Sequence, residues 1–276
     1  MRRTFIQTPE FYLANGFLPG PKTKRIAVEM PNGASIWVML DDLHVSSSII
    51  AGSWEPDETR FITSILGPGS IFLDIGSFVG WFALTAGPLV GPTGAVFAFE
   101  PQRAAHDLLR RSVLANRFEA WVSTFPLALS DHAGEVSLWR DAVPEGTAAS
   151  NLGHTWMDGS PSATGAEHVG AAQCCRLDDL SLGRHVDVVK LDVEGSEWRV
   201  LKGAERTIRS SHPVIICELF PAQLERASGV RGADLIALLE GWGYNSYRIE
   251  PSGGLTAWSP ADMPEGEHSY KTIVFR

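Results

Sequence analysis

The sequence predicts an α/β fold in which a mostly parallel sheet is covered by helices on both faces. Continuous apolar runs at 71–75 and 186–191 are typical of parallel strands that are buried on both sides. Segments with helical character separate these runs, and such alternation favours a parallel sheet. The 276 residues contain no Pro/Ser-rich linker, so we expect one large domain with an N-terminal extension.

The elements follow in order along the chain. An Asn-Gly pair between apolar-rich runs at 25–30 and 35–40 predicts a β-hairpin ahead of the main domain. The acidic pair Asp57 and Glu58 favours a helix at 56–66, which Gly-Pro-Gly ends. Further strands are expected at 71–75, 95–99, 120–125, 135–139, 186–191, 213–219, 244–249 and 272–275, the last two as an antiparallel closing pair. Further helices are expected at 79–89, 102–116, 197–209 and 223–240, the last weakened by Gly229 and Gly232.

A stretch at 141–173 is rich in Gly, Ala, Ser and Thr and contains His154, Trp156 and His168. A loop of this length inside a domain is more often functional than structural. We therefore interpret it as a lid or acceptor-binding insertion. The expected organisation is an extension with a hairpin at 1–55 and an α/β domain at 56–276.

Composition limits the partners and the compartment. The net charge of −9 and the absence of a basic tract disfavour nucleic acid as a partner. No apolar run approaches a membrane span, so we expect no membrane association. Three cysteines, two of them adjacent, do not form a disulfide framework, which favours the reducing cytoplasm. A homodimer is left open.

The turn after the strand at 71–75 carries the first candidate site. Asp74 precedes Gly76 and Gly80, and Glu100 follows the strand at 95–99. Glycines at such a turn let the backbone approach a ligand, and an acidic residue at the end of the second strand can accept both ribose hydroxyls. This combination predicts an adenosine-binding site.

The spacing of the glycines narrows the choice of ligand. G-x-x-x-G replaces the G-x-G-x-x-G that lets backbone amides surround a pyrophosphate, so a dinucleotide is disfavoured. The carboxylate of Asp74 suits a ligand with an ammonium group and no phosphate. S-adenosylmethionine fits that description.

Several sequence blocks then resemble a known family. The blocks are GSWEP at 52–56, FLDIG at 72–76, FEP at 99–101, ALSD at 128–131, KLDVEG at 190–195 and VLKGA at 200–204. They occur in the order seen in FkbM-type S-adenosylmethionine-dependent methyltransferases, over roughly 41–218. The resemblance implies a seven-stranded Rossmann-like class I methyltransferase fold and methylation of hydroxyl groups, often on sugars or natural products. The family's turn usually has Ala-Asn where this chain has Ser77 and Phe78.

The motifs and the resemblance together assign residues to two roles. Asp74 is expected to hold the methionine ammonium, Glu100 the ribose, and Glu55 the methionine end, although Glu55 could equally favour a helix N-terminus by its charge. The cofactor set is Glu55, Asp74, Gly76, Ser77, Gly80, Glu100, Pro101, Asn116, Ser130 and Asp192, with Asn116 and 128–130 near adenine. Trp54, Trp81 and Trp156 are candidates for stacking on an acceptor.

The second candidate site follows the strand at 186–191. Asp192 and Glu194 lie at a strand's carboxyl end, where open α/β sheets bind ligands. Methyl transfer needs an aligned nucleophile and an acceptor for one proton, and we assign that role to Asp192, with Glu194 and His154 as further catalytic candidates. A divalent metal held by Asp192, Glu194 and Glu218 is not favoured, because carboxylates also meet at strand ends in metal-free enzymes.

The leading hypothesis is an O-methyltransferase that uses S-adenosylmethionine and a small hydroxylated acceptor such as a sugar, a glycoside or a secondary metabolite. N- or C-methylation would use the same cofactor residues. A nicotinamide-dependent oxidoreductase would also use Glu100 for a ribose, but the missing G-x-G-x-x-G counts against it. A non-catalytic binding module is suggested only by Phe78.

Overall fold

The computed structural model describes residues 25–40, 42, 45–141, 155–157, 166–251, 253–266 and 269–276. The candidate His154 lies outside the described residues. The backbone at Trp156 is described, but its side chain is not.

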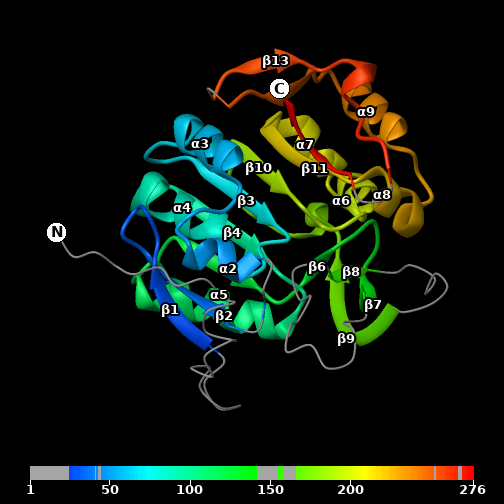
Figure 1. Ribbon diagram of the computed structural model, residues 1–276. Coiled ribbons are helices and arrows are strands. Elements are labelled where there is room, and N and C mark those ends of the chain that lie inside the picture. The colour runs from blue at the N-terminus through cyan, green and yellow to red at the C-terminus, as the bar shows by residue number, and fades with distance from the viewer. Residues whose placement is uncertain are drawn as a thin grey trace.

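An eight-stranded sheet forms the centre of the molecule, in the order β13-β12-β14-β11-β10-β3-β4-β5 (Figure 1). The strands from β11 to β5 are parallel to one another, whereas β14, β12 and β13 each pair antiparallel with their neighbours. The expected seven-stranded sheet is therefore wrong in number: β13 pairs with β12 outside the expected closing pair. The bounds are β3 (Ile71–Ile75), β4 (Ala95–Phe99), β5 (Val122–Phe125), β10 (Val188–Leu191), β11 (Val214–Leu219), β12 (Ser246–Ile249), β13 (Leu255–Ala257) and β14 (Lys271–Phe275).

Helices cover both faces of this sheet because successive strand residues point to opposite sides. Phe72 enters a core with the first group of helices, and Leu73 enters a second core with the other group. The first group is α2 (Val45–Ile50), α3 (Pro56–Ile65), α4 (Trp81–Val90) and α5 (Arg103–Ala115). The second is α6 (Glu197–Gly203), α7 (Glu205–Ser211), α8 (Pro221–Ser228) and α9 (Gly232–Gly241). None of the helices in the described part of the chain is long and apolar enough to cross a bilayer.

Two expected helices are interrupted. The helix expected at 197–209 is divided into α6 and α7 at Ala204. The helix expected at 223–240 is divided into α8 and α9 at Gly229, whose φ of 67° places it in the left-handed region. Glycine adopts this conformation without steric cost and commonly ends a helix.

A second, four-stranded sheet lies beside the first and has the order β6-β9-β7-β8. Its strands are β6 (Ala128–Leu129), β7 (Gly134–Asp141), β8 (Thr155–Met157) and β9 (Ala166–Cys175). The strand expected at 135–139 belongs to this sheet. The stretch at 141–173, expected as one loop, contains β8 and most of β9, so that expectation is corrected. Backbone pairing of β7 with β9 compensates for the weak side-chain pattern of this stretch.

The N-terminal strands β1 (Arg25–Glu29) and β2 (Ser35–Met39) pair antiparallel across the Asn-Gly turn. Ile36 and Val38 of β2 are fully buried in the core that α4 and α5 share. The Trp37 N–H donates to Oγ of Ser112 on α5 (2.9 Å). The hairpin therefore packs directly on the sheet's helical layer.

Asn116 clamps this hairpin to the end of α5. Its Oδ1 accepts the N–H of Ser35 (2.8 Å), and its Nδ2 donates to the Ser35 carbonyl (2.7 Å). We expect Asn116→Ala to lower the free energy of unfolding by about 1–2 kcal/mol, because two hydrogen bonds between distant segments are lost. Urea denaturation measures this change. Asn245→Ala, at an exposed position, serves as the control. A loss well below that range would show that the clamp contributes little.

Candidate functional site

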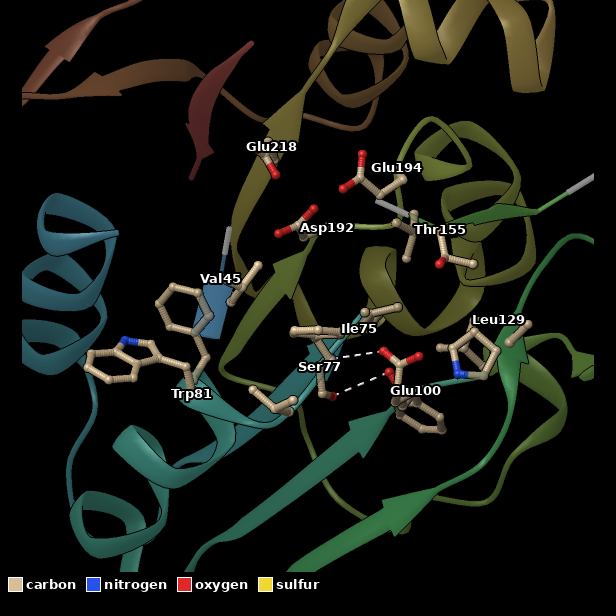
Figure 2. Close-up of a pocket in the computed structure, with 18 of the residues that line it drawn as sticks. Val45, Ile75, Ser77, Trp81, Glu100, Leu129, Thr155, Asp192, Glu194 and Glu218 are labelled. Carbon is tan, nitrogen blue, oxygen red and sulfur yellow. Dashed lines mark hydrogen bonds between the residues drawn. The ribbon is translucent and has the colours of Figure 1, made fainter. Parts of the chain in front are cut away.

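A cavity opens at the carboxyl ends of β3, β4, β10 and β11, between the two sheets and α2 (Figure 2). It holds about 1190 Å³ of space, part of it open to solvent. Carboxylates lie at both ends: Glu100 at one, and Asp192, Glu194 and Glu218 at the other. Open α/β sheets bind ligands at this edge.

The turn after β3 is built tightly around two glycines. Gly76 has a φ of 86°, and a Cβ on it would lie 1.7 Å from the backbone oxygen of Asp192. Gly80 has a φ of 98°, and a Cβ there would lie 2.4 Å from Leu109. Only glycine satisfies both demands at these positions. The glycines therefore join the turn to the Asp192 loop and to α5.

Ser77 and Phe78 complete this turn. The N–H groups of Gly76 and Ser77 both donate to the Phe99 carbonyl (3.0 Å each), and the Ser77 hydroxyl donates to the Asp74 carbonyl (2.7 Å). Phe78 has a φ of 47°, a conformation that favours Gly or Asn. Its N–H donates to Oε2 of Glu100 (2.8 Å), so the unusual residue shapes the turn through its backbone.

Glu100 follows β4 and is 6% exposed. Its Oε1 accepts the Gln102 N–H (2.7 Å), and its Oε2 accepts the Phe78 N–H. A carboxylate offers about four lone-pair sites, so these two bonds fix its orientation and leave acceptor capacity facing the cavity. Burial raises the pKa of Glu100 to about 7, against the lowering effect of the two N–H donors.

An apolar wall lies next to Glu100. Pro101, Leu129 and Met157 contribute to it, together with Phe99, Leu127 and Ala128. Thr155 of β8 lies on the same wall, and its hydroxyl accepts a hydrogen bond from Nε2 of Gln102 (2.9 Å). The wall and the carboxylate together suit a flat heterocycle attached to a ribose.

Asp74, the fourth residue of β3, is buried and does not line the cavity. It is 1% exposed, is not among the lining residues, and its Oδ2 has no hydrogen-bond partner. Burial raises its pKa to about 7, while Lys190, its register partner on β10, and the Ala83 N–H oppose the shift. Asp74 therefore lies beneath the turn, rather than on the cavity surface where a direct bond to a ligand ammonium would form.

The acidic end of the cavity is organised around a buried lysine. Nζ of Lys190 lies 3.0 Å from Oδ2 of Asp192 and 3.4 Å from Oε2 of Glu55. Oxygens of Glu55, Asp192 and Glu218 all lie within 4.8 Å of one another. Burial lowers the pKa of Lys190, but these three carboxylates outweigh it and raise that pKa above its ordinary value.

Burial in this cluster also raises the pKa of two of the carboxyl groups. Burial raises the pKa of Glu55 to about 7, against the attraction of Lys190. Burial, followed by the charge of Asp192, raises the pKa of Glu218 well above its usual range. Both carboxyl groups are therefore ionised less readily than a carboxyl group in water, and a nearby cation favours their ionised form.

The carboxylates with ligand-like spacing differ from the set considered, and not favoured, from the sequence. Among the described residues, Glu55 joins Asp192 and Glu218 in the group with ligand-like spacing, whereas Glu194 does not. Glu194 still lines the cavity, with a φ of 52°. Gly195 follows it at a φ of 96°, packed against the Gln223 backbone, and Glu197 accepts the N–H groups of Val193 and Gly195. This bracing holds the loop in its strained conformation.

The remaining candidates are distributed as follows. Most of the candidates line the cavity: Trp54, Glu55, Gly76, Ser77, Trp81, Glu100, Pro101 and Asp192. Gly80 begins α4 beneath the turn. The structure does not bring Asn116 or Ser130 to the cavity: Asn116 bonds to the hairpin, and the hydroxyl of buried Ser130 donates to Asp131 (3.2 Å). His168 is exposed on β9 against the Trp139 ring.

Three cavity features were missed from the sequence. Lys190 carried a signal, because a lysine inside the otherwise apolar strand β10 must be paired once buried. Thr155 and Met157 had none, since β8 belongs to the stretch expected as a loop. Phe220 and Tyr270 line the acidic end, with ring centroids 6.4 Å apart, and come from segments 50 residues distant in the sequence.

Comparison with known proteins bears on this site. A family model described as the Methyltransferase FkbM domain matches residues 74–246. The 31-O-demethyl-FK506 methyltransferase FkbM of Streptomyces tacrolimicus is 28% identical over 201 residues, covering 65% of this chain and 74% of that protein.

Solved structures include methyltransferase FkbM from Methylobacillus flagellatus KT, with 15% identity, a TM-score of 0.45, and coverage of 80% of this chain and 50% of that chain. This chain thus spans half the length of that structure. The SAM-dependent O-methyltransferase from Thermotoga maritima has 14% identity and a TM-score of 0.42, over 95% of this chain and 80% of that chain. The family match includes the turn, Glu100, Lys190, Asp192 and Glu218, and well over half of the chain. The chain belongs to the FkbM methyltransferase family.

Proposed function

We propose that this methyltransferase transfers the methyl group of S-adenosylmethionine to a hydroxyl of a small, uncharged or cationic acceptor. One observation carries the proposal: a single cavity joins a ribose-type carboxylate, Glu100, to a cluster of carboxylates at Asp192 and Glu218. The first end suits a nucleoside, and the second suits a positive charge and a hydroxyl donor.

The residues present fit this cofactor. Glu100 would accept the ribose hydroxyls, and the wall of Pro101 and Leu129 would hold adenine. The methionine end would face Glu55, whose charge favours the sulfonium and the ammonium. When bound, the cofactor supplies a methyl group on a positively charged sulfur.

The chain's own residues would orient the acceptor and take its proton. Asp192 lies at the carboxyl end of β10 and reaches the cavity surface, so we assign it to the acceptor hydroxyl. Oxygens of Glu218 and Asp192 lie within 4.8 Å, so the charge of Asp192 raises the pKa of Glu218, which would be the second carboxyl group near the acceptor hydroxyl. Trp54, Phe220 and Tyr270 line the same end and offer apolar faces on which a sugar ring or an aromatic acceptor can stack.

Charge restricts the acceptor further. The described lining residues include five carboxylates, at Glu55, Glu100, Asp192, Glu194 and Glu218, and no Lys, Arg or His. An anionic acceptor would be repelled at this end. The test is to incubate the protein with methyl-labelled S-adenosylmethionine and matched neutral, aminated and carboxylated glycosides, with mass spectrometry of the products. Label on a hydroxyl oxygen supports the proposal, whereas label on nitrogen or carbon alone contradicts it.

The raised pKa of Glu100 makes cofactor affinity depend on pH. Its carboxylate accepts ribose hydroxyls best when ionised, and burial raises its pKa to about 7. Affinity should therefore rise with pH, by about tenfold between pH 6 and 8, and then level off. Calorimetric titration with S-adenosylmethionine measures this directly. Glu100→Gln, which cannot ionise, should remove that part of the slope. A slope that persists in this variant would assign the titration to another group.

A further inference from the structure

Lys190 is buried where a lysine is costly. It is 1% exposed, lies inside the four-residue strand β10, and its ammonium stands 5.1 Å from the ring centroid of Phe82 on α4. Removing an ammonium from water is unfavourable unless close partners compensate for the lost hydration. The partners of Lys190 are the acidic residues of the cavity, so its position is tied to the site.

These partners come from separate parts of the chain. Asp192 follows β10 itself, at 3.0 Å from Nζ, and Glu55 stands before α3, at 3.4 Å. Glu55 has a φ of 39° and makes no side-chain bond to the N-terminus of α3. Its carboxylate is instead turned toward the lysine. The ammonium therefore links α3 to the end of β10.

The three carboxylates are spaced as the ligands of a metal ion would be, and the ammonium of Lys190 lies beside them. Oxygens of Glu55, Asp192 and Glu218 lie within 4.8 Å of one another, close enough to share one divalent cation. Without a positive charge, three carboxylates at that spacing would repel. Lys190 supplies such a charge from the protein side, while the carboxylates reach the cavity surface.

We propose that Lys190 is a positioning residue that acts as the resident cation of the acidic end, holding Glu55 and Asp192 at the cavity surface in place of a divalent metal ion. The catalytic part of this inference rests on the proposed function. The balance of charge between Lys190 and the three carboxylates does not depend on that function, because it concerns only four side chains of this protein. Turnover by the unmodified protein should then be insensitive to chelators and to added Mg²⁺ or Mn²⁺.

The central experiment replaces Lys190 with Met, which keeps most of the length and removes the charge. Lys190→Met should acquire Mn²⁺ binding, measured by electron paramagnetic resonance without cofactor or acceptor, while the unmodified protein and Lys202→Met bind none. Lys202 is a suitable control because it lies on α6, its side chain is 41% exposed, and it pairs with Glu205, which does not line the cavity. Equal Mn²⁺ binding by all three proteins would overturn the proposal, and so would none in a folded Lys190→Met.

Turnover provides a second readout. We expect kcat of Lys190→Met to fall about a hundredfold, with cofactor affinity changed far less, because the carboxylates lose their alignment. Added Mn²⁺ should restore part of kcat, and ethylammonium should do the same for Lys190→Ala, whereas neutral propanol should not. An unchanged kcat, or activation of the unmodified protein by Mn²⁺, would contradict the positioning role. If the unmodified protein methylates no acceptor, the proposed function fails while the Mn²⁺ binding test still decides the charge balance.

A second variant tests the proposal if Lys190→Met is too unstable to fold. Lys190→Met combined with Glu55→Gln removes one carboxylate together with the ammonium, which lowers the surplus negative charge. This double variant should be more stable than Lys190→Met in thermal unfolding and should lose the acquired Mn²⁺ binding. If it is no more stable than the single variant, the two side chains are not coupled and the proposal falls.

Discussion

Asp192→Asn should lower turnover by about 10²–10⁴-fold while cofactor affinity changes by less than about threefold. The carboxylate of Asp192 lies at the cavity surface and is held by Lys190 at 3.0 Å. Asparagine keeps the shape but cannot take a proton, and its amide would place a donor where the acceptor hydroxyl also donates. Single-turnover kinetics with a saturating acceptor separates this loss from slow product release.

The control is Asp107→Asn, at an exposed position on α5 far along the chain from the loop. It should leave both turnover and cofactor affinity unchanged. Should Asp192→Asn turn over at the unmodified rate, the residue orients nothing in the reaction, and Glu218 becomes the candidate to test next. A large loss of cofactor affinity would instead place Asp192 on the methionine end.

Glu100→Ala should weaken S-adenosylmethionine binding by about a hundredfold, or about 2.7 kcal/mol. Hydrogen bonds to a charged group contribute roughly 1.5–3 kcal/mol each, and the ribose has two hydroxyls to donate. The substitution also frees the N–H groups of Phe78 and Gln102, which now donate to the carboxylate. Calorimetry gives the affinity, and urea unfolding shows how far the turn itself is destabilised.

The product S-adenosylhomocysteine provides a second check on this prediction. It keeps the ribose and lacks the sulfonium charge, so Glu100→Ala should weaken both ligands by a similar factor. A loss confined to S-adenosylmethionine would mean that Glu100 acts on the positive charge rather than on the ribose. Glu119→Ala, at an exposed position after α5, should change neither affinity.

The central strands could be predicted because their signal is local. Ile71–Ile75 is apolar at four of its five positions and lies buried between two helical layers, as a parallel strand must. Gly76 and Glu100 were recognisable for a similar reason: each stands directly after a strand, where the chain direction dictates which edge of the sheet it reaches. Residues placed by one strand end are therefore accessible to reasoning from sequence.

Contacts between two distant segments could not be predicted in this way. Asn116 follows a helix that was expected, yet its partner Ser35 belongs to a hairpin whose docking leaves no trace in the local pattern. Glu55 reaches Lys190 across 135 positions of chain through a left-handed backbone that nothing in its neighbours announces. The β8 strand is three residues long and gains its order from pairing with β7. Tertiary contacts decided each of these.

The contact between Gly76 and the Asp192 backbone has a consequence for engineering. Because these two loops touch without room for a methyl group, a donor loop from another enzyme could not be grafted at either position alone. The turn that contains Gly76 and the loop that contains Asp192 would have to be exchanged together. Thr155 and Met157, by contrast, reach the cavity from the separate small sheet. Libraries that aim to change the acceptor should therefore vary Thr155 and Met157 and leave the Gly76 turn and the Asp192 loop unchanged.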